Sequence, residues 1–293
     1  MKLICVGDAM IDVIVKYQGD IQFNSDTSSN ITILSGGAAA NTSVWAARLG
    51  INTTFIGHVG DDLIGKSFIA ELRNQSVNVA NIEAKGFNTG TVVVLVDGNG
   101  ERTMFPSRGA NSLLSISDFS LTDFDALYLS GYSLLDEETS VTALQILEKA
   151  KREELTTFLD PASTGLMKRY GREKLLKNIQ GVDFLLLNEE EARFLSQSNS
   201  VEDMLSFLIG YAKCAVIKLG KDGAKAKVRQ GSINSVRALP AHVVDTTGAG
   251  DAFAAGFIAG WLTSRDIEKA LQSASDVAAK CVANIGARPS VNT

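Results

Sequence analysis

Short apolar runs alternate with amphipathic stretches along almost the whole chain of 293 residues. Each apolar run is short and near-continuous, which is typical of a strand that is covered on both faces. Strands that alternate with helices predict an α/β fold with a doubly wound, mostly parallel sheet flanked by helices. The expected strands are Leu3–Val6, Thr53–His58, Ala126–Ser130, Thr157–Leu159, Phe184–Leu187 and Ala215–Leu219, and the expected helices are Ala39–Leu49, Gly65–Gln75, Glu137–Lys151, Gly171–Ile179, Glu189–Leu195 and Val201–Tyr211.

Two segments break this rhythm, because they alternate polar and apolar residues and lack helical spacing. In one of them, Thr91–Phe105 predicts a hairpin that turns at Asp97–Gly100, where Asp-Gly and Asn-Gly favour tight turns. We expect a small β-sheet lid near the carboxyl ends of the main strands; the alternative is a pair of peripheral edge strands with no lid role. The expected lid comprises residues 13–34 and 88–107, and the expected core comprises residues 1–12, 35–87 and 108–293.

The overall charge excludes several kinds of partner. The formal net charge is −5 and no dense cluster of Lys and Arg occurs, so we expect neither a nucleic-acid nor a membrane partner. No apolar run is long enough for a membrane span, and the first residues resemble a buried strand rather than a signal peptide. We therefore expect a cytoplasmic protein.

Cysteine and histidine are too sparse for common metal or triad chemistry. The three cysteines, Cys5, Cys214 and Cys281, are far apart and lie in apolar runs, so we expect them to be buried and reduced. The two histidines, His58 and His242, leave little for a zinc site or a Ser-His-Asp triad. His242 lies in a strand-like run, so we expect it to pack rather than to act as a base.

A glycine-rich turn predicts an anion site. Val243–Asp245 resembles the end of a strand, and Ala252–Leu262 resembles an apolar helix. A strand, a glycine-rich turn and a helix in this order direct backbone N–H groups and a helix dipole at one spot. Gly248 and Gly250 allow backbone angles and close approaches that a Cβ would prevent. Such a nest stabilises the charge on a phosphoryl group during transfer.

Asp251 follows this turn directly, at the start of the expected helix. A carboxylate there can accept a proton from a hydroxyl group and orient its oxygen for in-line attack. Asp is also a favoured helix N-cap. The local sequence leaves both roles, cap and general base, open.

A second stretch, Gly60–Ser67, fits the P-loop pattern of nucleotide-binding proteins, with Gly65-Lys66-Ser67 at its end. The pattern has a physical difficulty, because Asp61 and Asp62 would place two carboxylates where phosphates should bind. The two aspartates are better explained as a helix cap or as groups beside a hydroxyl-rich substrate. A P-loop NTPase remains a competing hypothesis.

Two separated motifs resemble the PfkB family of carbohydrate kinases, which has the ribokinase-like fold. The first is Gly36-Gly-Ala-Ala-Ala-Asn41-Thr-Ser43, followed by Gly50 and Gly60, and the second is Asp245-Thr-Thr-Gly-Ala-Gly-Asp251-Ala-Phe-Ala-Ala-Gly256. The resemblance covers essentially the whole chain. It implies an ATP-dependent phosphotransferase with an alcohol group of a sugar as the acceptor.

The resemblance also implies the acceptor and catalytic residues. Asp12 matches the aspartate that binds sugar hydroxyl groups, and Gly37 and Asn41 match the substrate-binding turn. Ribokinase has an Asn where this chain has Met10, and a Glu where it reads Ser130–Leu134, which makes ribose doubtful as the substrate. The matching catalytic residues are Asp251 as the general base and Gly248, Ala249 and Gly250 as the anion hole.

Two arginines on the expected lid and its return strand, Arg102 and Arg108, match positions that contact acidic or phosphorylated substrates in some members of the family. Taken by themselves, they are equally well explained as surface arginines on an edge hairpin. Family members also pair through their lids, so the expected assembly is a homodimer through the lid.

The nucleotide and metal sites follow from the same resemblance. Asn188 and Glu191 match an element that organises Mg²⁺ and the phosphates through water; the residues alone also fit a helix cap with a solvated acidic turn. Lys218, Gly220 and Gly223 match the loop beside the adenine and ribose of ATP, with Gly250 at the phosphates. The residues that match the loop for a monovalent cation, K⁺, are Asp245, Thr247, Cys281, Asn284, Gly286 and Ser290.

The sequence thus predicts a kinase that uses ATP and Mg²⁺, with K⁺ as a further cofactor, to phosphorylate a small sugar. Two alternatives remain beside the P-loop hypothesis. One is a nucleoside kinase with the same fold, and the other is a sugar-binding protein without catalytic activity.

Overall fold

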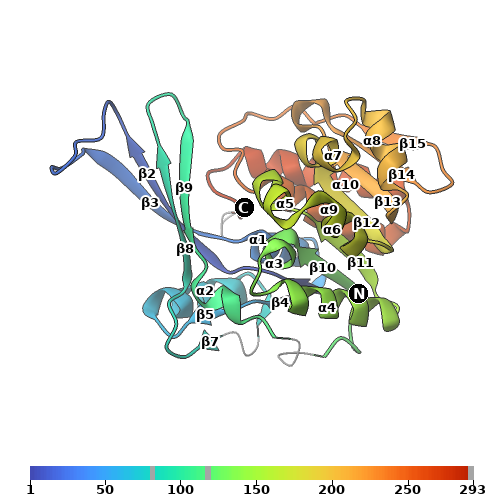
Figure 1. The fold of residues 1–293 in the computed structure, drawn as a ribbon, viewed down its shortest axis with the longest axis horizontal. Coiled ribbons are helices and arrows are strands. Elements are labelled where there is room, and N and C mark those ends of the chain that lie inside the picture. Colours follow the sequence, from blue (N-terminus) through green and yellow to red (C-terminus); the bar gives the residue numbers. More distant parts are fainter. Residues whose placement is uncertain (80–82, 116–119, 290–293) are drawn as a thin grey trace.

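The computed structural model describes residues 1–79, 83–115 and 120–289 and contains two main sheets (Figure 1). The larger sheet has nine strands, which are parallel except at one edge, where β14 and β15 are antiparallel. Its strand order is β15 (Ile233–Val236), β14 (Ala224–Val228), β13 (Ala212–Lys218), β12 (Val182–Asn188), β11 (Thr156–Asp160), β10 (Ala126–Ser130), β1 (Lys2–Val6), β4 (Asn52–Ile56) and β6 (Asn78–Val79).

Helices cover both faces of this sheet, because its central strands are apolar on both sides. In β1, Leu3 and Cys5 belong to one buried cluster, and Ile4 and Val6 belong to the other. This alternation follows from the two-residue period of a strand. The first cluster includes residues of α1 (Ala38–Arg48), α2 (Leu63–Asn74), α9 (Ala249–Ser264) and α10 (Ile267–Val282), and the second includes residues of α3 (Gly131–Leu135), α4 (Ser140–Arg152), α5 (Thr164–Tyr170), α6 (Arg172–Asn178), α7 (Glu189–Ser196) and α8 (Val201–Leu208). The predicted fold class is confirmed.

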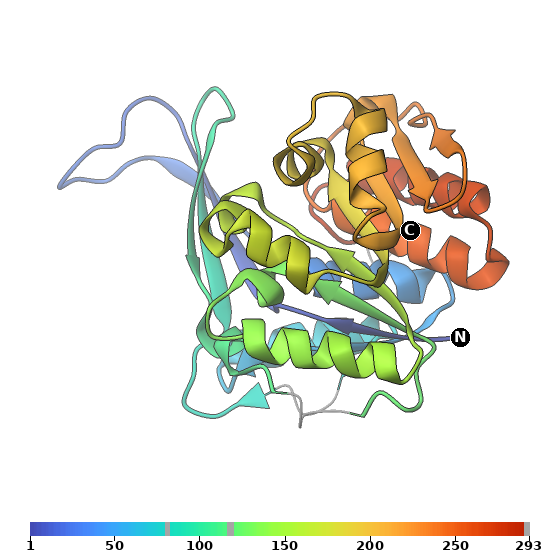
Figure 2. The ribbon, with the colours of Figure 1, turned by 45° about the vertical axis from the view of Figure 1, so that its right-hand side comes forward.

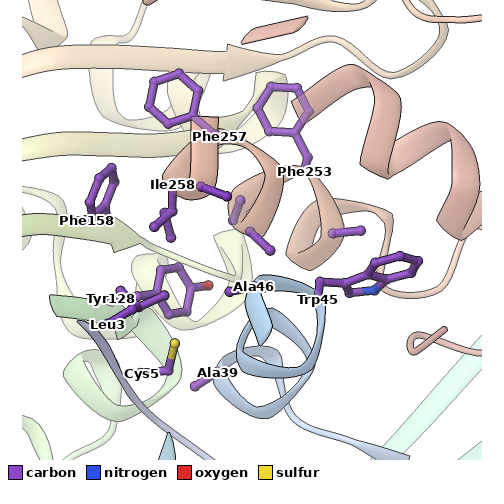
Figure 3. Packing of buried hydrophobic residues seen from close by; sticks show 14 of the residues in the cluster. Leu3, Cys5, Ala39, Trp45, Ala46, Tyr128, Phe158, Phe253, Phe257 and Ile258 are labelled. Carbon is purple, nitrogen blue, oxygen red and sulfur yellow. The ribbon is translucent and has the colours of Figure 1, made fainter. Parts of the chain in front are cut away.

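Helix α9 packs closely over the first face of the sheet, as Figure 3 shows for Phe253, Phe257 and Ile258. Phe257 meets Phe184 edge to face at 5.5 Å between ring centroids, a favourable geometry for aromatic rings. On its other side, a Cβ on Gly256 would lie 2.7 Å from a backbone oxygen of α10. The small residues of α9 therefore allow two helices and a sheet to meet near the glycine-rich turn.

The smaller sheet stands to one side of the helix-flanked sheet (Figures 1 and 2). It contains the predicted hairpin, with Asp97 N donating to the Glu101 carbonyl at the turn. Its first two strands extend past the predicted lid boundaries at residues 13 and 34, because they begin at Met10 and end at Gly36. Its strand order is β3 (Ser29–Gly36), β2 (Met10–Tyr17), β8 (Gly90–Val96) and β9 (Arg102–Ser107); a further pair consists of β5 (Val59–Gly60) and β7 (Glu83–Ala84).

One predicted strand is wrong. Residues 243–245 form no strand; Val243 and Val244 are 60% and 48% exposed, in a loop that pairs with no described strand. We expected His242, in the same loop, to pack against its neighbours, but it is exposed. Two adjacent valines favour a strand only where a neighbouring strand can accept them. By contrast, all three cysteines are buried and unpaired, as predicted.

No helix in the described part of the chain is long and apolar enough to cross a bilayer.

Candidate active site

The polar side chains gather where the central strands end. The connection after β1 leads through β2 and β3 to α1 and β4 on one side, whereas β10 continues through α3 and α4 to β11 on the other. β1 and β10 therefore flank a topological switch point, which is where ligands bind in open α/β sheets. The residues at or just beyond the carboxyl ends of the strands are Asp8, Ser130, Asp160, Asn188 and Lys218.

The glycine-rich turn leads directly into α9. Gly248 adopts φ 75°, and a Cβ there would lie 2.4 Å from the Cβ of Ala287, so both its backbone angle and its surroundings require glycine. No side chain among the described residues caps the start of α9. The first N–H groups of a helix have no acceptor within it, so those of Gly250 and Asp251 are available to bind an anion.

Asp251 lies in this first turn, beside the motif at the start of α1. Asn41 Nδ2 donates a hydrogen bond of 2.8 Å to Asp251 Oδ2. Burial raises the pKa of Asp251 to about 7; Asn41 opposes the shift, Asp160 adds to it, and Lys218 opposes it. A carboxyl group with a pKa near 7 is well matched to accept a proton at neutral pH.

Arg288, which the sequence analysis did not identify, binds the amide oxygen of Asn41, on the side away from Asp251. Its Nε donates to Asn41 Oδ1 at 2.9 Å, its Nη1 pairs with Glu71 at 2.7 Å, and its Nη2 donates to the Gly36 carbonyl at 3.0 Å. A guanidinium group can only donate, so the Asn41 oxygen must face Arg288. The amide nitrogen of Asn41 must then face Asp251. No local pattern marks Arg288, because its partners come from distant parts of the chain.

A buried ion pair lies on the other side of Asp251. Lys218 Nζ lies 2.6 Å from Asp160 Oδ2, and both side chains are largely buried. A Cβ on Gly250 would lie 3.5 Å from the same ammonium group, so Lys218 adjoins the anion nest. Burial lowers the pKa of Lys218, but Asp160 and Glu191 more than offset this, so the net shift is upward. Asp160 is a second residue that the sequence analysis did not assign to the site.

Asn188 and Glu191 form the capping box of α7. Asn188 Oδ1 accepts from Glu191 N at 2.8 Å, and Glu191 Oε2 accepts from Asn188 N at 2.8 Å. The alternative of a solvated acidic turn does not fit Glu191, which is 1% exposed. Burial raises its pKa to about 7, Asp160 adds to the shift and Lys218 opposes it. The two residues therefore cap a helix and also face the switch point.

The predicted acceptor residues lie near one another on the lid side. Gly37 adopts φ 93°, and a Cβ there would lie 2.1 Å from the Asp8 carbonyl oxygen. Asp12, on β2, lies across Gly36; burial raises its pKa, and Arg288 opposes this.

Arg108 is part of an ion-pair cluster that the sequence analysis did not predict. Its Nη2 pairs with Asp8 at 2.9 Å, and its Nε lies 3.4 Å from Asp136. Tyr132 lies near both this cluster and Asp251: burial and, after it, the charges of the nearby carboxylates, Asp251 first, together raise its pKa to about 12. Arg102 lies apart from these residues, exposed at the start of β9, where its charge lowers the pKa of Asp245 as a minor contribution.

The residues matched to the cation loop converge from two segments. Asp245 accepts hydrogen bonds from Thr247 N and from Gly286 N, at 2.9 and 3.0 Å. Cys281 Sγ lies 3.5 Å from the Thr247 carbonyl oxygen, and the Asn284 amide donates to the end of α10. Ser290 lies outside the described residues.

In the loop matched to the nucleotide, Gly220 and Gly223 both have positive φ and bracket the short 3₁₀ helix Gly220–Asp222. This tight turn follows β13 directly, so it is anchored beside Lys218.

The Gly60–Ser67 stretch packs against neighbouring parts of the chain and leaves no open loop for a phosphate. Asp62 caps α2 through Gly65 N at 2.7 Å, and it also accepts from Thr89 N at 2.8 Å. A Cβ on Gly60 would lie 2.2 Å from the Phe87 carbonyl oxygen. The loop is therefore closed against residues 87–89, which does not fit a phosphate cradle.

Comparisons with known proteins identify the family of this chain. The model of the pfkB family of carbohydrate kinases matches residues 1–293. A fructokinase of Klebsiella pneumoniae is 31% identical over 88% of this chain and 84% of its own, and an ATP-dependent 6-phosphofructokinase of Thermoanaerobacterium thermosaccharolyticum is 27% identical over 97% and 89%. The structure of adenosine kinase from Sinorhizobium meliloti superposes with a TM-score of 0.87 and 26% identity, over 98% of this chain and 95% of that one.

These matches cover the fold, both motifs and nearly the full length of the relatives. The chain therefore belongs to the pfkB family of carbohydrate kinases, phosphotransferases that act on a hydroxyl group.

Proposed function

We propose that the protein transfers the γ-phosphoryl group of ATP to a hydroxyl group of a small sugar or sugar derivative, with Asp251 as the general base. The observation that carries the proposal is the position of Asp251 in the uncapped first turn of α9. The carboxylate of Asp251, with a pKa of about 7, therefore lies beside N–H groups that can stabilise a phosphoryl group during transfer.

Each residue at the switch point has a role in this reaction. Asp251 accepts the proton of the attacking hydroxyl group, and Asn41 holds its carboxylate in place. The backbone of Gly248, Ala249 and Gly250 forms the anion hole. Lys218, held by Asp160, contributes positive charge next to that backbone. ATP, when bound, supplies the phosphoryl group and a leaving group.

The nucleotide side has the chemistry to bind ATP with Mg²⁺. Among the described residues, no group of three or more His, Cys, Asp or Glu side chains could enclose a metal ion. Mg²⁺ commonly keeps its waters and binds through the substrate phosphates, so a single buried carboxylate, Glu191, is sufficient to hold it through water. The residues assigned to the nucleotide are Asn188, Glu191, Lys218, Gly220, Gly223 and Gly250.

A K⁺ ion fits the loop that Asp245 organises. The loop offers a carboxylate and backbone carbonyls, and hard oxygen donors suit alkali cations. A cation there would add positive charge beside the anion hole, since Thr247 lies next to Gly248. The proposed ligand segments contain Asp245, Thr247, Cys281, Asn284, Gly286 and Ser290.

The lid side receives the acceptor. Asp12, Gly37 and Asn41 are proposed to contact it, with Arg102 and Arg108 lining the lid and its return strand. The small sheet would close over the acceptor and exclude water, which limits wasteful hydrolysis of ATP.

The likeness to adenosine kinase favours a second candidate, a nucleoside acceptor. Competition between adenosine and free hexoses for the acceptor site would distinguish the two candidates.

We also propose a cytoplasmic homodimer that pairs through the partly exposed apolar face of the small sheet. Direct register partners place Ile33, Val13, Val93 and Phe105 in one row on that face, and Ile33 and Phe105 are 66% and 56% exposed. Such an exposed apolar patch suits a second copy of the chain. Sedimentation of Ile33→Lys beside the unaltered protein tests this assembly, because a dimer through this face should dissociate.

The central test compares two single variants. Asp251→Asn should lower the rate of phosphoryl transfer by a factor of about 100 to 10,000, while ATP binding persists. Lys66→Ala should leave the activity largely intact. The reverse pattern would establish the Gly60–Ser67 loop as the nucleotide site and overturn the proposal.

A further inference from the structure

We propose that the acceptor is an uncharged, hydroxyl-rich molecule, and that sugars carrying a phosphate or carboxylate group are excluded. This inference rests on the proposed function and deepens it. It is not implied by the family, whose members reported above include both a fructokinase and a 6-phosphofructokinase.

The first observation is that Arg108 already lies beside two carboxylates, although its Nε donates no hydrogen bond among the described residues. Its Nη2 lies 2.9 Å from Asp8 and its Nε lies 3.4 Å from Asp136, so one guanidinium group faces two carboxylates. Its Nη1 donates to the Tyr132 carbonyl at 3.2 Å. A substrate anion could recruit Arg108 only by displacing carboxylates from a largely buried ion pair, which leaves those carboxylates uncompensated.

Arg288 is engaged in the same way. Its three nitrogens reach Asn41, Glu71 and the Gly36 carbonyl, and its guanidinium group lies over the ring of Phe68 at 4.8 Å. The side chain is only 7% exposed. Turning it toward a substrate would also release the Asn41 amide that holds Asp251.

The charge on the acceptor side is consequently negative. Two guanidinium groups, of Arg108 and Arg288, face five carboxylates of the described residues. These carboxylates belong to Asp8, Asp12, Glu71, Asp136 and Asp251. A dianionic phosphate placed among them would meet net repulsion in a partly desolvated site.

Hydrogen-bonding chemistry leads to the same conclusion. The carboxylates of Asp12 and Asp251 are acceptors, and they require donors from the ligand. Sugar hydroxyl groups supply such donors, whereas an ionised phosphate or carboxylate supplies none. A Cβ on Gly36 would lie 2.7 Å from the Asp12 carboxylate, so glycine at this position allows Asp12 to lie close against the turn that carries Asn41.

The lid carries two further cations, and one of them, Arg102, lies close enough to the loop of Asp245 for its charge to lower the pKa of that carboxyl group. Lys16 and Arg102 share one row of the small sheet through Val96, on the face that also carries Asp12. Lys16 is four positions beyond Asp12 on β2, which corresponds to roughly 13 Å along the strand. Burial raises the pKa of Asp12, and the charge that opposes this shift is that of Arg288 rather than that of either lid cation.

Matched acceptor pairs test the inference on the full-length protein with ATP and Mg²⁺. The pairs are fructose and fructose 6-phosphate, ribose and ribose 1-phosphate, and adenosine and AMP, and the measurement is kcat/KM from ADP release. We expect every acceptor that is used to be the neutral member of its pair, preferred by at least about 100-fold. Preferred use of any charged member, with loss of that activity in Asp251→Asn, would overturn this inference and leave the kinase function standing. Inactivity with all six compounds and a wider neutral panel would overturn the proposed function and this inference with it.

Two variants test the cause of the selectivity. Glu71→Gln and Asp136→Asn each remove a carboxylate from an engaged arginine, and each should lower the preference for the neutral member by about tenfold. Glu148→Gln is the matched control, since it removes an exposed carboxylate from an ion pair with Lys151 on α4. A preference that stays unchanged in both test variants would overturn the electrostatic explanation, as would an equal change in the control.

Discussion

The amide of Asn41 donates a hydrogen bond of 2.8 Å to the carboxylate of Asp251, across 210 residues of chain. The bond joins the two glycine-containing motifs at the starts of α1 and α9. It also opposes the effect of burial on the pKa of Asp251, because a donated hydrogen bond stabilises the ionised form.

The first prediction concerns the pH dependence of catalysis. Asp251 must be ionised to accept a proton, and its pKa is about 7, so kcat/KM should fall as the pH drops through about 7. In Asn41→Ala the carboxylate loses its donor. The acid limb of the pH profile, which is the range where kcat/KM falls with decreasing pH, should therefore move to higher pH by about one unit. The measurement is kcat/KM from pH 5.5 to 9. Asn78→Ala, which removes a surface amide bonded to Asn52, should leave the limb in place; an unshifted limb in Asn41→Ala contradicts the role of the bond.

A second prediction concerns Arg288 as a positioning residue. Lys cannot donate to Asn41, Glu71 and Gly36 at once in the same geometry, so Arg288→Lys should lower kcat/KM by about tenfold. The acid limb should also move up, while the KM for ATP stays constant.

Arg172→Lys is the matched control for Arg288→Lys. Arg172 Nε donates to the Leu195 carbonyl, and its guanidinium group lies 5.4 Å from the ring centroid of Phe207. The two arginines therefore have similar surroundings, but only one contacts Asn41. Equal losses in the two variants, with no shift of the acid limb, would reduce Arg288 to a packing role.

A third prediction concerns the buried ion pair of Lys218. Lys218→Met leaves Asp160 and Glu191 buried without a cation, which should lower the free energy of unfolding by about 3 kcal/mol at pH 8. The loss should be smaller at pH 5.5, because burial raises the pKa of Glu191 to about 7, and protonation of this group removes part of the uncompensated charge. The raised pKa of Lys218 keeps its own contribution fully present across this range, since that contribution is lost only at alkaline pH.

Urea denaturation at the two pH values measures the effect of Lys218→Met. Lys213→Met breaks an ion pair with Asp183 whose lysine is 73% exposed, and it should cost at most about 1 kcal/mol. The double variant Asp160→Asn/Lys218→Met should recover part of the loss. A loss in Lys218→Met that is independent of pH would show that packing, and not charge, accounts for it.

The last prediction compares two glycines with positive φ. Gly248→Ala places a Cβ 2.4 Å from Ala287, so the turn must shift and kcat should fall by about 100-fold or more. Gly171 has φ 96° but no atom within 4 Å of its Cβ position. Gly171→Ala should therefore cost about 1 kcal/mol of stability through its backbone angle alone and retain full activity. Activity retained in Gly248→Ala would contradict the geometry of the anion hole.

The fold was predictable where local pattern and tertiary environment agree. The buried runs of β1, β10 and β12 are apolar at every central position, so their sequence alone indicates strands covered on both faces. The hairpin of β8 and β9 was marked by its Asp-Gly and Asn-Gly pairs. The antiparallel edge was missed because β14 alternates Ala and Lys, which fits a half-exposed strand and a turn equally well.

The site was predictable only where its residues lie in motifs. Asn41 and Asp251 were found because each lies beside glycines that a phosphate or sugar site requires. Arg288 and Asp8 were not, since their roles come from contacts with side chains more than 90 residues away. No period or spacing in the sequence records such contacts. Their charge states also depend on burial, which only the folded chain determines.

The position of Arg288 has a consequence for biosynthesis. The amide that orients Asp251 is held by a side chain that lies after both motifs in the sequence, beyond the end of α10. A nascent chain that stops before Arg288 can contain both motifs and still lack the contact that fixes Asn41. The contact that orients Asp251 through Asn41 is therefore completed only after synthesis has passed Arg288.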